Sequence, residues 1–160
     1  MRKLVLVLIS ALTLTMFLGS CKKTCNDVNA PNYSQEGTCL DYASAIAGTY
    51  NGSIEDTIAG TPANTRTISV SVTKIDASHV QITPSDGSIA FTAKVTALNG
   101  NYLLAVTAGT YQQEPYTGYS LVQFGVNTNG FYNTSTRQFG YELDANDGTN
   151  DFQEAFFGSR

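Results

Sequence analysis

Residues 88–108 read SIAFTAKVTALNGNYLLAVTA, and this stretch predicts two antiparallel strands joined by a tight turn. Apolar and polar residues alternate along its first half, which is typical of a strand with one buried and one solvated face. Asn99-Gly100 stands in the middle, and this pair accepts the positive φ angles that a two-residue hairpin turn requires. The second half is an almost continuous apolar run from Tyr102 to Val106, as expected for a strand covered on both faces.

The same period of two continues along the chain from Ala47 onward, and Val, Ile, Thr, Tyr and Phe are frequent in it. Strands are expected near residues 48–55, 67–75, 79–83, 88–97, 102–108, 119–127, 131–143 and 151–157. Further turns are expected at Asp86-Gly87, Asn129-Gly130 and Asp147-Gly148, with Asn133 to Thr136 as an alternative turn inside the seventh strand. A short helix is considered only for Leu40 to Ile46.

Sequential hairpins make a meander, and a meander of eight strands removes its exposed edges by closing into an up-and-down antiparallel barrel. A sandwich of two β-sheets is the alternative, because the same alternation would satisfy it. Alternate connections of a meander lie at the same end. At one end three connections are longer, namely Asp56–Arg66, Gly109–Gly118 and Asp144–Asn150. Binding is therefore expected at this looped end.

The N-terminus has the pattern of an export signal. Arg2 and Lys3 precede an apolar run that ends at Leu18, and this run is too short to span a bilayer as a helix. Leu18-Gly19-Ser20-Cys21 follows and resembles the lipobox of bacterial lipoproteins. The resemblance implies cleavage before Cys21 and a diacylglyceryl group on its thiol, so that acyl chains hold the protein on a membrane. An ordinary signal peptide and a retained transmembrane anchor are the alternatives.

The expected organisation is a signal peptide over residues 1–20, a lipidated tether over 21–46 and a β-barrel over 47–160. Cys25 and Cys39 lie in the exported part, where paired thiols usually form a disulfide, and closing this loop would restrict the unfolded chain by about 3 kcal/mol. Unpaired thiols and pairing between molecules are the alternatives. Lys22-Lys23 stand where surface-export signals look acidic, so the periplasmic face of the outer membrane is favoured over the cell surface.

Composition excludes several classes of function. The chain has 160 residues, a net charge of −4, a single His and no Trp. An acidic domain of this size is not expected to bind nucleic acid, and the absence of a Cys/His cluster leaves little material for a zinc or catalytic site. No cofactor and no metal are expected. His79 lacks a nucleophile motif and is interpreted as a surface residue, and Glu55-Asp56 should point to opposite faces of one strand.

Two other segments are candidates for contacts or modification. Tyr111, Tyr116 and Tyr119 lie in or beside the connection 109–118, and tyrosine suits contacts with sugars, peptides or proteins; the alternative is that the rings cap the barrel core. Asp56-Thr57-Ile58 resembles the acceptor pattern of Bacteroidetes O-glycosylation, which makes Thr57 a candidate. Asp144 to Asp151 offers several oxygen ligands but misses the EF-hand spacing, so a solvated turn is expected there rather than a calcium site.

Gly48-Thr49-Tyr50 at the start of the first strand resembles the Gly-x-Trp/Tyr opening of lipocalin-like (calycin) barrels. Together with the lipobox, it makes the chain similar to small envelope lipoproteins of Bacteroidetes-type bacteria. The first hypothesis is therefore a lipid-anchored, non-enzymatic binding or accessory module of the cell envelope, which meets a protein or glycan at its looped end. The alternative is a lipocalin-like carrier of a small apolar ligand inside the barrel, and a carboxylate-based hydrolase ranks third.

Overall fold

The computed structural model describes residues 23–111, 123–124, 129–146 and 151–160, and this part of the chain is almost entirely β-structure. A single short helix, α2 (Tyr42–Ile46), precedes the strands. The strands are β1 (Gly48–Ile58), β2 (Thr61–Lys74), β3 (His79–Pro84), β4 (Ile89–Leu98), β5 (Asn101–Tyr111), β6 (Gln123–Phe124), β7 (Asn129–Asn133), β8 (Gln138–Asn146) and β9 (Asp151–Ser159). No helix in these ranges is long and apolar enough to span a membrane.

The strands form a closed eight-stranded antiparallel barrel with up-and-down topology. Pairing runs in the order β1-β2-β3-β4-β5-β7-β8-β9, and β9 returns to pair with β1 from Asn51↔Ser159 to Ile58↔Phe152. The two-residue strand β6 pairs with the end of β8. The predicted barrel is confirmed, and the two-sheet sandwich is excluded because the first and last strands are hydrogen-bonded to each other.

The hairpin predicted at Asn99-Gly100 is confirmed. Leu98 pairs with Asn101, and both turn residues have positive φ angles, 50° at Asn99 and 81° at Gly100. The first connection, by contrast, is not the long loop expected over Asp56–Arg66. Strands β1 and β2 both extend through this stretch and turn at Ala59-Gly60, because the cross-strand partners continue in register up to Ile58↔Thr61 after one shift.

The turn predicted at Asn129-Gly130 is wrong, and the alternative at Asn133 to Thr136 is correct. The Asn133 side-chain oxygen accepts hydrogen bonds from the backbone N–H groups of Ser135 and Thr136, which folds the chain back without an Asn-Gly pair. Gly130 lies within β7, where the packing is close: a Cβ there would lie 3.1 Å from the carbonyl oxygen of Gly140. The predicted seventh strand is therefore two strands, β7 and β8, which belong to neighbouring positions of the barrel.

The inner face of the barrel is filled by side chains. Aromatic rings dominate it: Tyr50 stacks on Phe139 with centroids 4.7 Å apart, and Phe91 meets Tyr141 edge-on at 5.0 Å. Aliphatic residues of every long strand except β9 complete the cluster, and each of its members is at most 8% exposed. Burial of this apolar surface is the main force that stabilises the fold.

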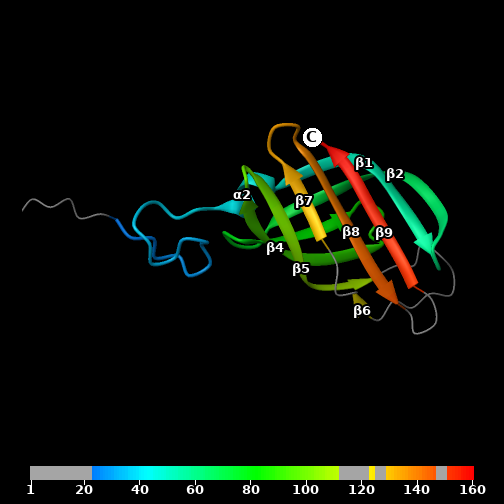
Figure 1. The fold of residues 1–160 in the computed structure, drawn as a ribbon, viewed down its shortest axis with the longest axis horizontal. Helices are drawn as coiled ribbons and strands as arrows, with labels where there is room; N and C mark the ends of the chain where they lie inside the picture. The colour runs from blue at the N-terminus through cyan, green and yellow to red at the C-terminus, as the bar shows by residue number, and fades with distance from the viewer. Residues whose placement is uncertain (1–22, 112–122, 125–128, 147–150) are drawn as a thin grey trace, which may run out of the picture.

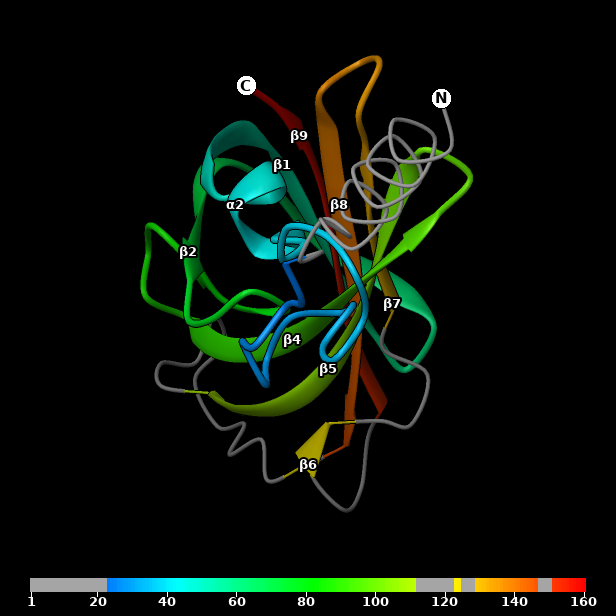
Figure 2. The ribbon, with the colours of Figure 1, turned by 90° about the vertical axis from the view of Figure 1, so that its left-hand side faces the viewer.

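Helix α2 covers one end of the barrel (Figures 1 and 2). Asp41 caps its first turn by accepting a hydrogen bond from the Ser44 backbone N–H, as expected of an N-cap aspartate. Ala43 and Ile46 are fully buried in the barrel core. The C-terminal Arg160 donates to the carbonyl oxygens of Ala45 and Ala47 at the other end of the helix, so the last strand also holds α2 in place.

Candidate functional site

The residues before α2 form a folded wall rather than a free tether. We call residues 23–41 the lead segment. A disulfide joins Cys25 and Cys39, as the sequence predicts, and Cys25 packs with Ala30 and with Ala77 of the β2–β3 connection. Asn32 is 8% exposed and bonds the Thr38 carbonyl and the Leu40 backbone N–H, so its amide fixes the turn inside the disulfide loop.

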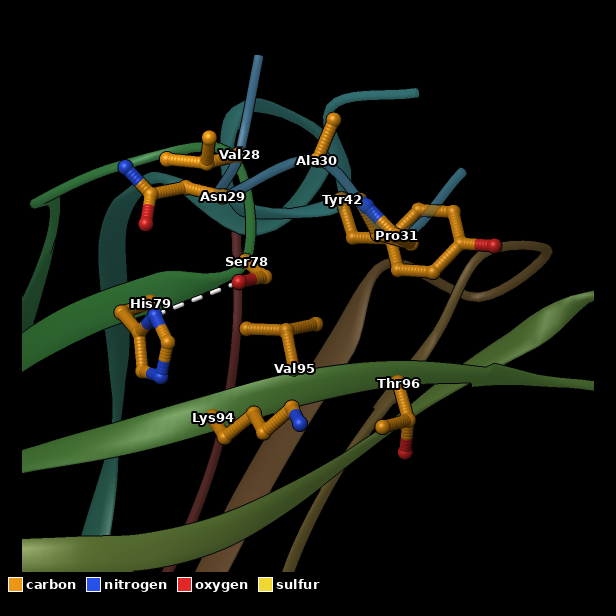
Figure 3. Close-up of a pocket in the computed structure, with 10 residues that line it drawn as sticks. All are labelled: Val28, Asn29, Ala30, Pro31, Tyr42, Ser78, His79, Lys94, Val95 and Thr96. Atoms are coloured by element: carbon orange, nitrogen blue, oxygen red, sulfur yellow. Dashed lines mark hydrogen bonds between the residues drawn. The ribbon is translucent and has the colours of Figure 1, made fainter. Parts of the chain in front are cut away.

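A cleft of about 410 Å³ lies between this lead segment and the barrel (Figure 3). The backbone N–H groups of Tyr42 and Ala43 donate to the Ala77 carbonyl oxygen, which ties the start of α2 to the β2–β3 connection. The lead segment, the start of α2, β3 and β4 supply the lining, which consists of Val28, Asn29, Ala30, Pro31, Tyr42, Ser78, His79, Lys94, Val95 and Thr96. Its volume falls in the range that binds small molecules, about 300–1,000 Å³.

His79 is the titratable side chain at one edge of the cleft, and Asp76 fixes its orientation. Nδ1 of His79 lies 3.0 Å from both carboxylate oxygens of Asp76 and 3.2 Å from the Ser78 hydroxyl. Burial alone would raise the pKa of Asp76, but hydrogen bonds from the Ser78 backbone N–H and from His79 outweigh it and hold this pKa below its ordinary value. The imidazole is thus held by one nitrogen and presents Nε2 on its other side.

This Ser-His-Asp group does not have the geometry of a nucleophilic triad. In such a triad the carboxylate orients one ring nitrogen while the hydroxyl contacts the other. Here Asp76 and Ser78 both contact Nδ1 of His79. Ser78 is therefore not placed to pass its proton to Nε2.

Lys94 lies directly opposite His79 in the pairing of β3 with β4, so the two side chains project from the same face of the sheet. Lys94 is exposed and forms no ion pair with any residue of the described ranges. The lining of the cleft contains no carboxylate. Lys94 therefore supplies the formal positive charge of the lining, and the Asp76 carboxylate, which lies just outside the lining and contacts His79, carries the opposite charge.

A second polar group lies inside the other end of the barrel. The Arg66 guanidinium on β2 contacts the carboxylate of Asp56 and lies 3.1 Å from Asp86 and 3.4 Å from Glu154. Asp56 and Glu154 are fully buried and stand opposite each other in the β1–β9 pairing. The Tyr141 hydroxyl donates to Glu154 at 2.9 Å. We call these five residues the Arg66 network.

The pKa shifts inside this network follow from its excess of carboxylates over basic side chains. Burial alone would lower the pKa of Arg66, but attraction by Asp56, and then by Glu154 and Asp86, raises it above its ordinary value. Burial likewise opposes ionisation of Asp86, yet hydrogen bonds from Ser88 and the charge of Arg66 lower its pKa. Across the described ranges no cluster of three or more His, Cys, Asp or Glu side chains is arranged to hold a metal ion.

Most of the predicted site residues lie away from this described chemistry. Cys21, Tyr116 and Tyr119 are outside the described residues, and Tyr111 is placed only as the last residue of β5. Thr57 lies within β1 and is partly buried, not in a long loop. Glu55 is exposed and Asp56 is buried, as the alternation predicts for neighbours on a strand.

Sequence reasoning missed both groups of charged side chains, namely the pair His79 and Lys94 in the cleft and the Arg66 network. His79 and Lys94 are far apart in the sequence, and only the β3–β4 register brings them together. Glu154 could have been found, because Phe152, Glu154 and Phe156 share one phase of the alternation and the aromatic residues assign that phase to the core. An inward-facing Glu then requires a cation, and Arg66 is the one that β2 supplies.

Comparisons with known proteins support the fold. Neither models of protein families nor curated protein sequences match the chain. Among solved structures, a Bacteroides fragilis protein described as a "putative outer membrane protein" matches with a TM-score of 0.51 and 15% sequence identity over 79% of this chain. The match covers 55% of that protein, so this chain spans little more than half of its length. A structure described as EF1p2_mFAP2b bound to DFHBI matches with a TM-score of 0.40 and 12% identity, over 74% of this chain and 97% of that one. The chain is therefore similar in fold to part of this Bacteroides fragilis protein.

Proposed function

We propose that the protein is a lipid-anchored, non-enzymatic binding or accessory module of the bacterial cell envelope, with a lipidated Cys21 and with its partner contacts at the looped end of the barrel. The observation that carries the proposal is that the two ends of the barrel differ. The lead segment joins the barrel at the α2 end, whereas the β1–β2 and β3–β4 connections and the C-terminal ends of β5 and β8 lie at the opposite end (Figure 1). An anchor at Cys21 would therefore leave the looped end free to meet a partner.

Charge supports the same orientation. In the half nearer the looped end, the described residues include one cation, Arg66, and six acidic residues: Glu55, Asp56, Asp86, Asp144, Asp151 and Glu154. In the other half, Lys23, Lys74, Lys94, Arg137 and Arg160 balance Asp27, Glu36, Asp41, Asp76 and Glu142. The net negative charge of the described chain thus belongs to the half away from the anchor. A partner with a basic surface would be steered toward that half.

The filled interior favours this function over the lipocalin-like carrier. Ile68, Val70, Phe91 and Tyr141, which a carrier would need to leave apart, pack in one buried cluster. A carrier of a small apolar molecule needs an internal cavity of about 300 Å³ or more. On this proposal, the resemblance of Gly48-Thr49-Tyr50 to lipocalin-like barrels reflects a shared barrel fold and not the binding of an internal ligand.

The anchor is tested with Cys21→Ser in the full-length chain, followed by membrane fractionation and metabolic labelling with a fatty-acid analogue. The wild-type protein should carry the label and sediment with membranes, and the variant should lose the label. The double variant Cys25→Ser/Cys39→Ser is the matched control, because it removes the other two thiols and should keep the label. An unlabelled wild-type protein would contradict the proposal.

The looped-end contact is tested separately with a photo-crosslinking amino acid placed in the lipidated protein in intact cells. Position 55 is exposed near the looped end, and position 137 is exposed in the β7–β8 turn at the α2 end. One discrete crosslinked species from position 55, absent from position 137, is the expected result. Equal crosslinking from both positions would remove the support for an oriented module.

A further inference from the structure

We infer that the cleft between the lead segment and the barrel is a binding site for a small molecule that combines an anionic head, a phosphate or carboxylate, with a short apolar body. This site is separate from the looped end and does not depend on the proposed function. The inference rests on three features of the cleft: its polar edge, its apolar wall and the rigidity of that wall.

The polar edge fits an anion. Lys94 brings an ammonium group that is not neutralised by any carboxylate of the described ranges, and His79 stands opposite it on β3. Figure 3 shows the His79 ring with Nδ1 turned to Ser78 and Nε2 turned away from it. The amide of Asn29 and the hydroxyl of Thr96 add hydrogen-bond donors to the lining. Charge-assisted hydrogen bonds from such groups are the strong interactions of oxyanion binding.

The opposite wall fits an apolar body. Val28, Pro31 and the Tyr42 ring line it, and Val28 is 70% exposed and so accessible to a ligand. Tyr42 is held by its ring contact with Tyr102, whose centroid lies 5.5 Å away. A purely ionic ligand would leave this wall unused, and a purely apolar one would leave the polar edge unused.

The lead segment that forms this wall is held in place without a ligand. The disulfide, the Asn32 hydrogen bonds and the contacts of Cys25 and Ala30 with Ala77 fix the lead segment against the β2–β3 connection. A site that is already ordered loses little conformational entropy on binding, so even a small ligand can bind measurably.

The test uses phenyl phosphate, a water-soluble probe with both features, and the full-length protein as cells produce it, together with nanodiscs of zwitterionic lipid. Saturation-transfer NMR gives the dissociation constant. Inorganic phosphate tests the need for the apolar body, and phenyl glucoside tests the need for the charge; both should bind at least about tenfold more weakly than phenyl phosphate. Benzoate should bind as well, because carboxylate and phosphate share the required chemistry.

Three variants locate the site. Lys94→Gln should weaken phenyl phosphate binding about tenfold, and Thr96→Trp should abolish it by filling the cleft with a residue that strands tolerate. Lys23→Gln is the matched control, since it removes the same charge from an exposed position that does not line the cleft, and it should leave the affinity within about twofold. Loss of affinity in Thr96→Trp counts only if its thermal unfolding matches the wild type.

Anionic lipid in the nanodiscs separates the two sources of such a ligand. If it competes with phenyl phosphate in the wild type but not in Lys94→Gln, the head group belongs to a membrane lipid; if it does not compete, the ligand is a soluble anion. Undetectable binding of phenyl phosphate and benzoate would overturn the inference. Equal binding by Lys94→Gln and Lys23→Gln, or equal affinity for phenyl phosphate and inorganic phosphate, would also overturn it.

Discussion

At the residue scale, Arg66 holds together the charges that are most costly to bury. Asp56 and Glu154 are 0% exposed and lie on adjacent strands, with the Arg66 guanidinium contacting both. Removing one partner of a buried ion pair leaves an uncompensated charge and is strongly destabilising, whereas the intact pair adds little net stability.

We predict that Arg66→Met lowers the free energy of unfolding by about 3–5 kcal/mol, because two carboxylates would then face each other inside the barrel. Urea unfolding followed by circular dichroism measures the change. Lys74→Met is the matched control: Lys74 pairs with Asp41, both side chains are more than one-third exposed, and the loss should stay below about 1 kcal/mol. If both variants lost the same free energy of unfolding, the Arg66 guanidinium would not be needed to compensate the buried carboxylates.

The buried hydroxyl of Tyr50 leads us to expect that the folded state loses stability at alkaline pH. Burial raises its pKa to about 12, although the charge of Arg160 opposes the shift, and its hydroxyl donates to the Ile46 carbonyl at 2.6 Å. The folded state therefore keeps the phenol neutral at a pH where the unfolded chain, with a pKa near 10, ionises. Stability from this group is complete below pH 10 and is lost as the pH rises toward 12.

We expect the free energy of unfolding to fall by up to about 2–3 kcal/mol between pH 10 and 12 on account of Tyr50. Tyr50→Phe should lose about 1 kcal/mol at neutral pH, through the missing hydrogen bond, but should show a shallower decline in this window. Urea unfolding at several pH values compares the two proteins. Parallel declines in both would assign the alkaline transition to other groups.

At the scale of elements, the lead segment is a small unit held by its own disulfide and attached to the barrel through Ala77 and α2. Its few buried residues predict that it can open locally while the barrel stays folded. The barrel strands, in contrast, share one continuous core and one closed set of ladders. The two parts should therefore respond differently to reduction.

Reduction, or the double variant Cys25→Ser/Cys39→Ser, should speed amide hydrogen exchange across residues 23–41 and leave exchange in β1, β8 and β9 unchanged. The physical reason is that the disulfide closes only the lead loop, so its loss frees about 3 kcal/mol of chain entropy in that loop alone. Intact mass should rise by two hydrogens on reduction of the wild type. Faster exchange throughout the strands would mean that the lead segment is part of the barrel's cooperative unit.

At the scale of the whole molecule, the described residues of the barrel interior pack together in one core. Phe139 is fully buried in this core, and its ring contacts Tyr50, Tyr141 and Phe156. Barrels of eight strands are just wide enough for side chains to fill the interior. Here the aromatic rings do so.

The wild-type protein should therefore show no saturable binding of benzene or a small apolar dye. Phe139→Ala should cost about 3–5 kcal/mol of stability and should create a dry cavity that takes up benzene. Calorimetry or ligand-observed NMR provides the measurement, and thermal unfolding with and without benzene provides the control. Saturable binding by the wild type would restore the carrier hypothesis.

Local sequence signals predicted most elements of this fold. Alternation gave the positions of the first five strands, because a strand buried on one face must repeat with a period of two. The turn at Asn99-Gly100 followed from its own residues, whereas the short helix over Tyr42–Ile46 was only considered, because its sequence is too short to carry a clear helical pattern. The same signals failed at Asn129-Gly130, where Gly130 packs closely against Gly140 and Leu104 inside a strand and a neighbouring Asn-Thr-Ser turn is equally well formed.

The sequence by itself determined that the chain is an acidic, all-β protein with two cysteines placed to form a disulfide, since composition, alternation and spacing are local properties. Tertiary structure alone decided that Asp56 lies opposite Glu154, that Lys94 lies opposite His79 and that the lead segment walls a cleft. The reason is that ring closure and strand register bring together residues far apart in the chain. No local pattern contains the pairing partner of a strand.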